Sequence, residues 1–135
     1  MRFVWKHLPL ESLHPDAPAA HVAAEAARKQ GKFWEFHDKL FANQRNLKMD
    51  AFRSHAQELG LDLEQFERDF QDVRNKAIVD ADIAEARSMG LTGTPGFFIN
   101  GRYLRGAQPF SGFAKLIDAE LQRLGRPLPE SRRGP

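Results

Sequence analysis

The chain has 135 residues, of which 41% are hydrophobic and 28% charged, and these proportions favour one globular domain over a disordered chain. Its net charge of +2, without clustered cations, does not indicate a nucleic-acid-binding protein, and no apolar run reaches the length of a membrane span. The sequence contains no cysteine, which excludes disulfides, thiolate metal ligands and cysteine nucleophiles within these residues.

The first part of the chain is predicted to be one strand followed by helices. Aromatic and β-branched side chains predict a strand over residues 3–8. An alanine-rich helix is expected over residues 19–30, with Asp16 as its candidate N-cap and Gly31 as its stop. A second helix is expected over residues 32–44. Its apolar stripe comprises Phe33, Phe36, Leu40 and Phe41.

Two more helices are expected before the pattern changes. One covers residues 50–59 and stops at Gly60. Asp62 and Gln65 begin and end a capping box, which opens a fourth helix that is expected to continue to Met89. The predicted buried face of this fourth helix comprises Phe66, Phe70, Val73, Ala77 and Ala81.

The last third of the chain predicts a hairpin and a helix. Residues 96–99 and 102–105 are two short strands joined by Asn100-Gly101, which favours a type I′ turn because both central residues of that turn adopt positive φ. A last helix is expected over residues 109–124, and the tail at 126–135, rich in Pro, Gly and Arg, is expected to be disordered. The inner face of the last helix comprises Phe113, Leu116, Ile117, Leu121 and Leu124.

Four stretches of the chain follow one family pattern in the same order. They are residues 3–10 with His14-Pro15 after them, the alanine helix running into residues 30–38, residues 93–101, and residues 106–109 leading to Phe113 and Ile117-Asp118. In this combination the chain resembles the DsbA-like thiol–disulfide oxidoreductases, which have a thioredoxin fold with a helical insertion. The resemblance implies an α/β domain with an incomplete thioredoxin-like fold over residues 1–125 and a helical insertion over about residues 17–90.

The chain departs from this family pattern at its start. Family members begin with a strand and a helix that carries Cys-x-x-Cys, whereas this sequence opens at what would be the next strand. We therefore expect a fragment or truncated form of such an oxidoreductase, which is inactive by itself because disulfide exchange requires a thiolate. An engineered deletion, a misplaced start codon and a degenerate gene would all give this pattern.

Thr94-Pro95 is the candidate substrate-binding site. By the resemblance, the proline is cis and the backbone before it hydrogen-bonds an extended polypeptide. The alternative is an ordinary trans Thr-Pro at the start of a strand, where the missing N–H has no consequence. No catalytic residue, cofactor or metal is expected in this chain.

The histidines are weighed as metal ligands and rejected. His7, His14 and His21 recur every seven residues, but this spacing crosses a strand, a loop and a helix start and imposes no common face. His37 is interpreted as a packing or capping residue rather than a catalytic base.

Charged residues offer weaker candidates. Asp80, Asp82 and Glu85 lie on the fourth helix, where a buried Asp82 could tune redox chemistry, but a solvated helix face is the favoured interpretation. In the tail, Arg126, Arg132 and Arg133 could contact acidic surfaces, but we interpret them as a solvated chain end.

The missing segment has consequences for assembly. By the resemblance, the absent strand would lie between residues 3–8 and residues 96–100, so its loss leaves two unpaired edges. Either residues 3–8 pair with residues 97–99, or a second chain fills the gap by strand addition or swapping. We expect a homo-oligomer, most simply a dimer, and neither nucleic acid nor membrane as a partner.

Two other functions remain open at this point. One is a non-catalytic thioredoxin-fold module that associates with itself or binds extended polypeptide along Thr94. The other, weaker, is an isomerase or transferase of the same fold that uses an external thiol. The family works in the periplasm or elsewhere outside the cytoplasm, where disulfides persist, and we expect no signal peptide in this chain.

Overall fold

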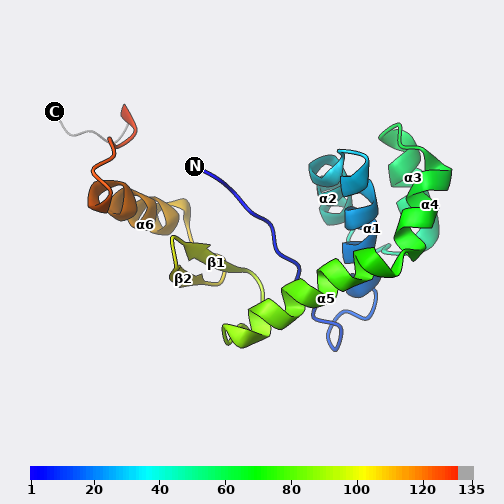
Figure 1. Cartoon of the computed structure of the whole chain (residues 1–135), viewed down its shortest axis with the longest axis horizontal. Helices are drawn as coiled ribbons and strands as arrows, with labels where there is room; N and C mark the ends of the chain where they lie inside the picture. Colours follow the sequence, from blue (N-terminus) through cyan, green and yellow to red (C-terminus); the bar gives the residue numbers. More distant parts are fainter. Residues whose placement is uncertain (131–135) are drawn as a thin grey trace. The chain divides into compact units, whose positions relative to one another are not determined.

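The computed structural model describes residues 1–130, and the chain divides into two compact units, Met1–Gly90 and the residues from Leu91 onward. The first unit contains five helices: α1 (Ala17–Lys29), α2 (Phe33–Ala42), α3 (Met49–Glu58), α4 (Leu63–Gln71) and α5 (Val73–Ser88). The second contains the strands β1 (Gly96–Ile99) and β2 (Arg102–Arg105), followed by helix α6 (Phe110–Arg123) (Figure 1). The predicted α/β class is confirmed.

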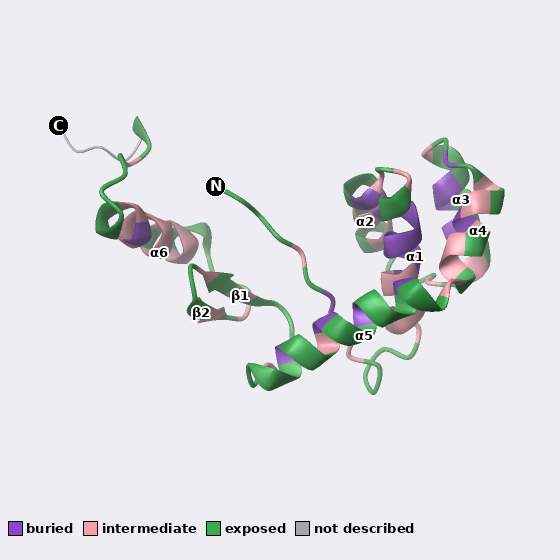
Figure 2. Cartoon of the chain, in the orientation of Figure 1, coloured by how far each residue is buried: buried purple, intermediate pink, exposed green. Residues whose placement is uncertain are grey.

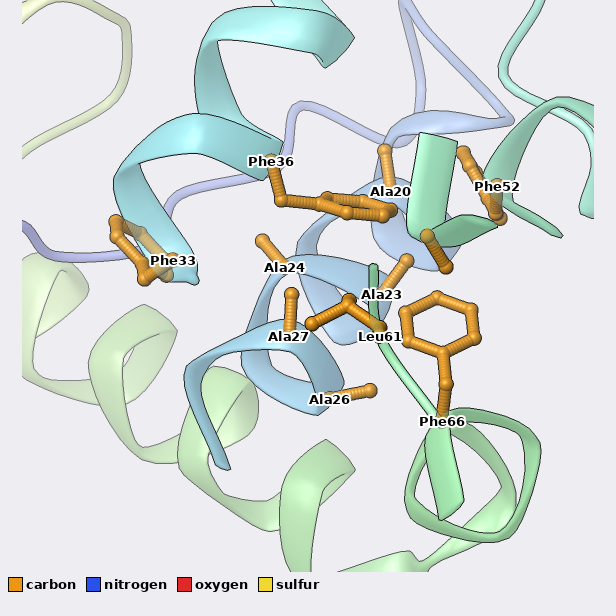
Figure 3. Close-up of a cluster of buried hydrophobic side chains, with 11 residues drawn as sticks. Ala20, Ala23, Ala24, Ala26, Ala27, Phe33, Phe36, Phe52, Leu61 and Phe66 are labelled. Atoms are coloured by element: carbon orange, nitrogen blue, oxygen red, sulfur yellow. The ribbon is translucent and has the colours of Figure 1, made fainter. Parts of the chain in front are cut away.

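The alanine-rich sequence of α1 sets the packing of the first unit. Ala23, Ala26 and Ala27 are fully buried, and their small side chains leave room for large ones on the helices packed against α1. Phe36 of α2 and Phe66 of α4 are also fully buried, with ring centroids 5.5 Å apart. Figure 3 shows the aromatic rings gathered around the alanines. Each fully buried aromatic side chain contributes roughly 1.5–3 kcal/mol to the free energy of unfolding.

The predicted fourth helix is two helices, so the expectation of one uninterrupted helix is wrong. Asp72 has extended backbone (φ −70°, ψ 118°), and its side chain accepts a hydrogen bond of 2.9 Å from the Arg74 N–H, which begins α5 as an N-cap. The break changes which residues of α5 are buried. Val73, Ala77 and Ala81, predicted to be buried, are exposed. The buried residues of α5 are instead Asn75, Val79, Asp82 and Ala86.

Residues 3–8 do not form a strand, which corrects the prediction. Among the described residues the only sheet is β1 with β2, and no backbone hydrogen bond joins residues 3–8 to either strand. The stretch has the composition of a strand but no neighbour to pair with, and strands are defined by that pairing. Figure 1 draws it as a plain tube from the N-terminus.

The hairpin forms as predicted. Ile99 pairs with Arg102 across a two-residue turn, and Asn100 (φ 49°) and Gly101 (φ 83°) both have the positive φ of a type I′ turn. Phe97 packs its ring against Phe113 of α6, with centroids 4.7 Å apart.

The predicted inner face of α6 is covered only in part. Its apolar residues are half-buried, apart from Leu124, which is 51% exposed. Glu120 is the one buried residue in the described part of the second unit (Figure 2).

Of the predicted capping and stop residues at Asp16, Gly31 and Asp62, the structure confirms the last two. Gly31 (φ 74°) follows α1 as expected, and Asp62 Oδ1 accepts from the Gln65 N–H at 2.8 Å at the start of α4. Asp16 occupies the N-cap position of α1 but its side chain makes no capping hydrogen bond, because it pairs with Lys48 at 2.7 Å instead. Within the described residues, no helix has both the length and the apolar character to cross a membrane.

Candidate strand-binding edges

Residues 3–8 are held on the first unit by their side chains. Lys6 Nζ pairs with Asp82 Oδ1 and Glu85 Oε2, each at 2.8 Å, and the His7 backbone N–H donates to Asp82 Oδ2 at 2.9 Å. Hydrogen bonds from Lys6 to Asp82 and then to Glu85 raise the pKa of Lys6 to about 12. Asp82 is only 8% exposed, so the interpretation of this carboxylate as part of a solvated face is wrong. The Asp82 carboxylate occupies the position that a strand carbonyl would take beside His7.

The side chain of His7 is buried in a polar cluster on α1. Its Nδ1 lies 2.7 Å from Nδ1 of His21, and its Nε2 lies 2.6 Å from Oε1 of Glu25. One proton must lie between the two Nδ1 atoms, since two protonated nitrogens at this distance would repel. Burial lowers the pKa of His21 to about 4, and the neighbouring His7 acts in the same direction. The His21 imidazole is therefore uncharged over the neutral range of pH.

Glu25 joins this cluster to the rest of α1. Its carboxylate is 3% exposed and accepts from Arg28 Nε at 2.9 and 3.0 Å as well as from His7. Burial acts to raise the pKa of Glu25, but the hydrogen bonds from His7 and Arg28 outweigh it, and the pKa lies below its usual value. His21, Glu25 and Arg28 share one face because they are four and three residues apart on the helix.

An aromatic cluster lies beside the same segment. The Trp5 ring contacts His37, Trp34 and Phe41 at centroid distances of 4.4, 6.1 and 6.3 Å. Phe3 adds a contact to Trp34 at 5.6 Å. The prediction that His37 is a packing residue is confirmed. Phe3, Trp34 and Phe41 keep 60%, 44% and 56% of their surface exposed, so the cluster has an apolar outer side.

The contacts of the segment alternate in the manner of a strand. Trp5 and His7 reach residues of α1 and α2, whereas Lys6 between them reaches α5. In extended chain the N–H and C=O of successive residues point to opposite edges. The edge of the odd-numbered residues is capped at the His7 N–H by Asp82. The edge of Val4, Lys6 and Leu8 has no backbone hydrogen bond within the described chain.

The second unit has its own open edge beside Thr94-Pro95. Both residues are exposed and the bond between them is cis. Because Ile99 and Arg102 flank a two-residue turn, they form a hydrogen-bonded pair, and the N–H and C=O of Gly96 and Phe98 point away from β2. The described chain has no strand on that side of β1.

Of the heptad-spaced histidines, the structure brings together only His7 and His21. His14 is exposed, and among the described residues no group of three or more His, Cys, Asp and Glu side chains could hold a metal. Sequence reasoning missed the contact of His7 with His21. The available signal was the spacing of His21 and Glu25, four residues apart on one predicted helix, which places an imidazole and a carboxylate on one face.

The other charged candidates lie at the surface. Asp80 pairs with Lys76 at 2.7 Å across one helical turn, with both side chains exposed, and Glu85 is half exposed. Arg126 is exposed, and its backbone N–H donates to the Leu121 carbonyl at 2.8 Å. Arg132 and Arg133, with the end of the predicted disordered tail, lie outside the described residues.

The sequence model of the DSBA-like thioredoxin domain matches residues 1–118. The chain belongs to this family. Its DsbA-like character, inferred from the hairpin, the helical insertion and four sequence stretches, is confirmed.

Curated relatives of this DsbA-like chain carry the name of a transporter. A Na(+)/H(+) antiporter NhaA 3 of Salinispora tropica is 44% identical over 102 residues, which cover 76% of this chain and 16% of that protein. A NhaA 1 of Mycolicibacterium gilvum is 37% identical over 119 residues, covering 87% and 19%. A NhaA of Herminiimonas arsenicoxydans is 41% identical over 119 residues, covering 88% and 19%. The chain thus spans less than a fifth of the length of these relatives.

Proposed function

We propose that this chain is the cysteine-free part of a DsbA-like thiol–disulfide oxidoreductase and that it exchanges no disulfides by itself. The observation that carries the proposal is the absence of cysteine from a chain that belongs to this family. Disulfide exchange begins with the attack of a thiolate on a disulfide sulfur, and the thiolate is also the leaving group. No other side chain in the sequence supplies that chemistry.

The relatives suggest a setting for this part. In proteins named as Na(+)/H(+) antiporters, a region similar to this chain makes up less than a fifth of the length. We propose that the chain likewise acts as a DsbA-like region of a longer polypeptide, on the side of the membrane where this family generally works, outside the cytoplasm.

A thiol assay tests the first proposal. The purified chain is mixed with insulin and dithiothreitol, and the turbidity from reduced insulin is followed. We expect the same rate as with dithiothreitol alone, with a Cys-x-x-Cys thioredoxin as the positive control. A rate above that background, lost when the protein is unfolded, would disprove the proposal.

A second candidate function is the binding of extended polypeptide along β1. It is supported by the exposure of Thr94 and Pro95 and by the outward backbone groups of Gly96 and Phe98. An added strand would pair with these groups, and residues beside the hairpin would contact its side chains.

Two matched proline variants test the second candidate. Phe98→Pro removes an outward N–H from the free edge of β1, and Tyr103→Pro removes one from the opposite edge, on β2. Binding of a fluorescent, cysteine-free unfolded polypeptide is measured by anisotropy. We expect the first variant to weaken binding about tenfold and the second to leave it unchanged, since one or two hydrogen bonds of about 1 kcal/mol are lost. Equal effects of both variants would contradict binding along β1.

A further inference from the structure

Residues 3–8 can pair with another strand along only one of their two backbone edges. The Asp82 carboxylate caps the edge of the odd-numbered residues at His7, so an incoming strand meets a competing acceptor there. The opposite edge presents the N–H and C=O of Val4, Lys6 and Leu8 without a backbone partner in the described chain. Only this second edge is free to extend a ladder.

The side chains at this edge favour a partner that is extended and partly apolar. Phe3 and Val4 are 60% and 53% exposed, and the Phe3 ring contacts Trp34, which is itself 44% exposed. Exposed apolar side chains next to unpaired backbone are the usual determinants of edge-to-edge association.

A second copy of the same segment satisfies these requirements in one register. In an antiparallel pair centred on Trp5, Val4 lies opposite Lys6 and Arg2 lies opposite Leu8, so each cation faces an apolar residue. Centring the pair on Val4 places Arg2 opposite Lys6, and centring it on Lys6 places the two lysines opposite each other. Like charges directly opposite each other are destabilising, so charge selects the register centred on Trp5.

The register centred on Trp5 also forms its hydrogen bonds through the open edge of Val4, Lys6 and Leu8. When Val4 and Lys6 exchange backbone hydrogen bonds, the two copies of Trp5 form a non-hydrogen-bonded pair on the twofold axis, where side chains approach most closely. Aromatic pairs at such positions add to strand association. The hydrogen bond from the His7 N–H to Asp82 remains intact in both copies, because it lies on the outer edge of each strand.

We propose that two copies of this chain associate through the Val4, Lys6 and Leu8 edge as a twofold antiparallel strand pair centred on Trp5. The proposal goes beyond the redox-inactive role proposed above and does not rest on it. The interface is isologous, so the same short segment supplies both halves of the contact.

Paired substitutions separate the role of the backbone from that of the side chain. Val4→Pro removes an N–H from the open edge, and Val4→Ala removes only the side chain. Phe3→Pro and Phe3→Ala form the matched pair at the capped edge. Sedimentation equilibrium of the full chain gives the dimer dissociation constant for each variant, with circular dichroism to verify the helical content.

The expected results differ between the two edges. Val4→Pro raises the dissociation constant at least about tenfold above that of Val4→Ala, since two hydrogen bonds per dimer are lost. Phe3→Pro and Phe3→Ala have dissociation constants within about twofold of each other, since neither changes a ladder hydrogen bond. A monomer at all concentrations up to the millimolar range would overturn the proposal, and so would equal constants for Val4→Pro and Val4→Ala in a chain that does dimerise.

Cross-linking tests the register independently. Because the chain has no cysteine, a single introduced thiol reports on one position. Oxidative disulfide formation between copies is expected to be fastest for Trp5→Cys and slower for Val4→Cys and Lys6→Cys, and a maximum at residue 4 or 6 would overturn the register. The insulin assay is independent of these measurements, so failure of the dimer and failure of the redox-inactive assignment are distinguishable.

Discussion

The two units of the chain bury their apolar side chains to different extents. In Met1–Gly90 the alanine face of α1 and three fully buried phenylalanines form a closed core. From Leu91 onward the hairpin and α6 leave every apolar side chain of the described residues at least partly accessible, and the only buried residue is Glu120. The first unit has the core of an independent domain, whereas the second is held by a few half-buried contacts.

This difference separates the helical part of the chain from its strand-forming part. Helices α1 to α4 bury apolar side chains on one another. The hairpin and residues 3–8 each have an edge with no strand beside it in the described chain. The closed core therefore lies in the helical unit, and the strand edges without a neighbour are the ones for which we propose binding partners.

The largest expected effect is in the core of the first unit. Phe36→Ala removes a fully buried ring and is expected to lower the free energy of unfolding by about 3–5 kcal/mol. The matched change in the second unit, Phe97→Ala, removes a half-buried ring and is expected to cost about 1 kcal/mol. Urea denaturation followed by tryptophan fluorescence and circular dichroism measures both. Equal losses would show that the second unit has a core as tight as the first.

A second effect is the pH dependence of the first unit. The pKa of His21 is about 4 in the folded chain, against about 6.5 when solvated. Between these values the unfolded chain binds a proton that the folded chain does not, so the free energy of unfolding falls as the pH is lowered from 6.5 to 4. The fall attributable to His21 is at most about 3 kcal/mol.

Two histidine variants isolate this contribution. His21→Gln is expected to flatten the fall between pH 6.5 and 4, and His14→Gln, at an exposed position, is expected to leave it unchanged. Burial also lowers the pKa of His55, which adds a fall of the same sign below pH 6.5, so some slope is expected to remain in His21→Gln. Denaturation midpoints at successive pH values measure the difference, and an unchanged slope in His21→Gln would disprove the role of His21.

The smallest expected effect is local to the second unit. Glu120 accepts from Arg102 at 2.9 Å and from Arg123 at 2.8 Å, which connects β2 to α6. Glu120→Gln is expected to speed amide hydrogen exchange in the hairpin while leaving the first unit unaffected. Lys115→Gln, on the exposed face of α6, is the control, and hydrogen exchange with mass spectrometry measures both. No change in the hairpin would contradict a role of the Glu120 carboxylate in holding it to α6.

Local chemistry made much of this fold predictable. Asn100-Gly101 determines its turn by backbone sterics alone, and the spacing of Phe33 and Phe36 reveals a buried helix face without reference to the rest of the chain. Asp72 is different, because a single aspartate within a continuous helical pattern does not predict that one helix ends and another begins there. Once α5 begins there, its inner face follows from packing against α1 rather than from the apolar residues of its own sequence.

The candidate edges were predictable only in part. Thr94-Pro95 follows from the family pattern, but the burial of Asp82 depends on its meeting Lys6 and His7, more than 70 residues away in sequence. The same holds for the contact of His7 with His21. Contacts between polar side chains of distant elements depend on tertiary geometry, which periodicity and capping do not encode.

The extended segment at residues 3–8 has a consequence for its lifetime in the presence of proteases. A protease active site takes up its substrate as an extended chain and forms backbone hydrogen bonds with it, as an added strand does. Residues 3–8 offer that backbone on one edge, and the exposed Arg2 beside them is a site that trypsin recognises. A strand paired at Val4, Lys6 and Leu8 would occupy the same groups, so the rate of cleavage near this end reports directly on whether the edge is filled.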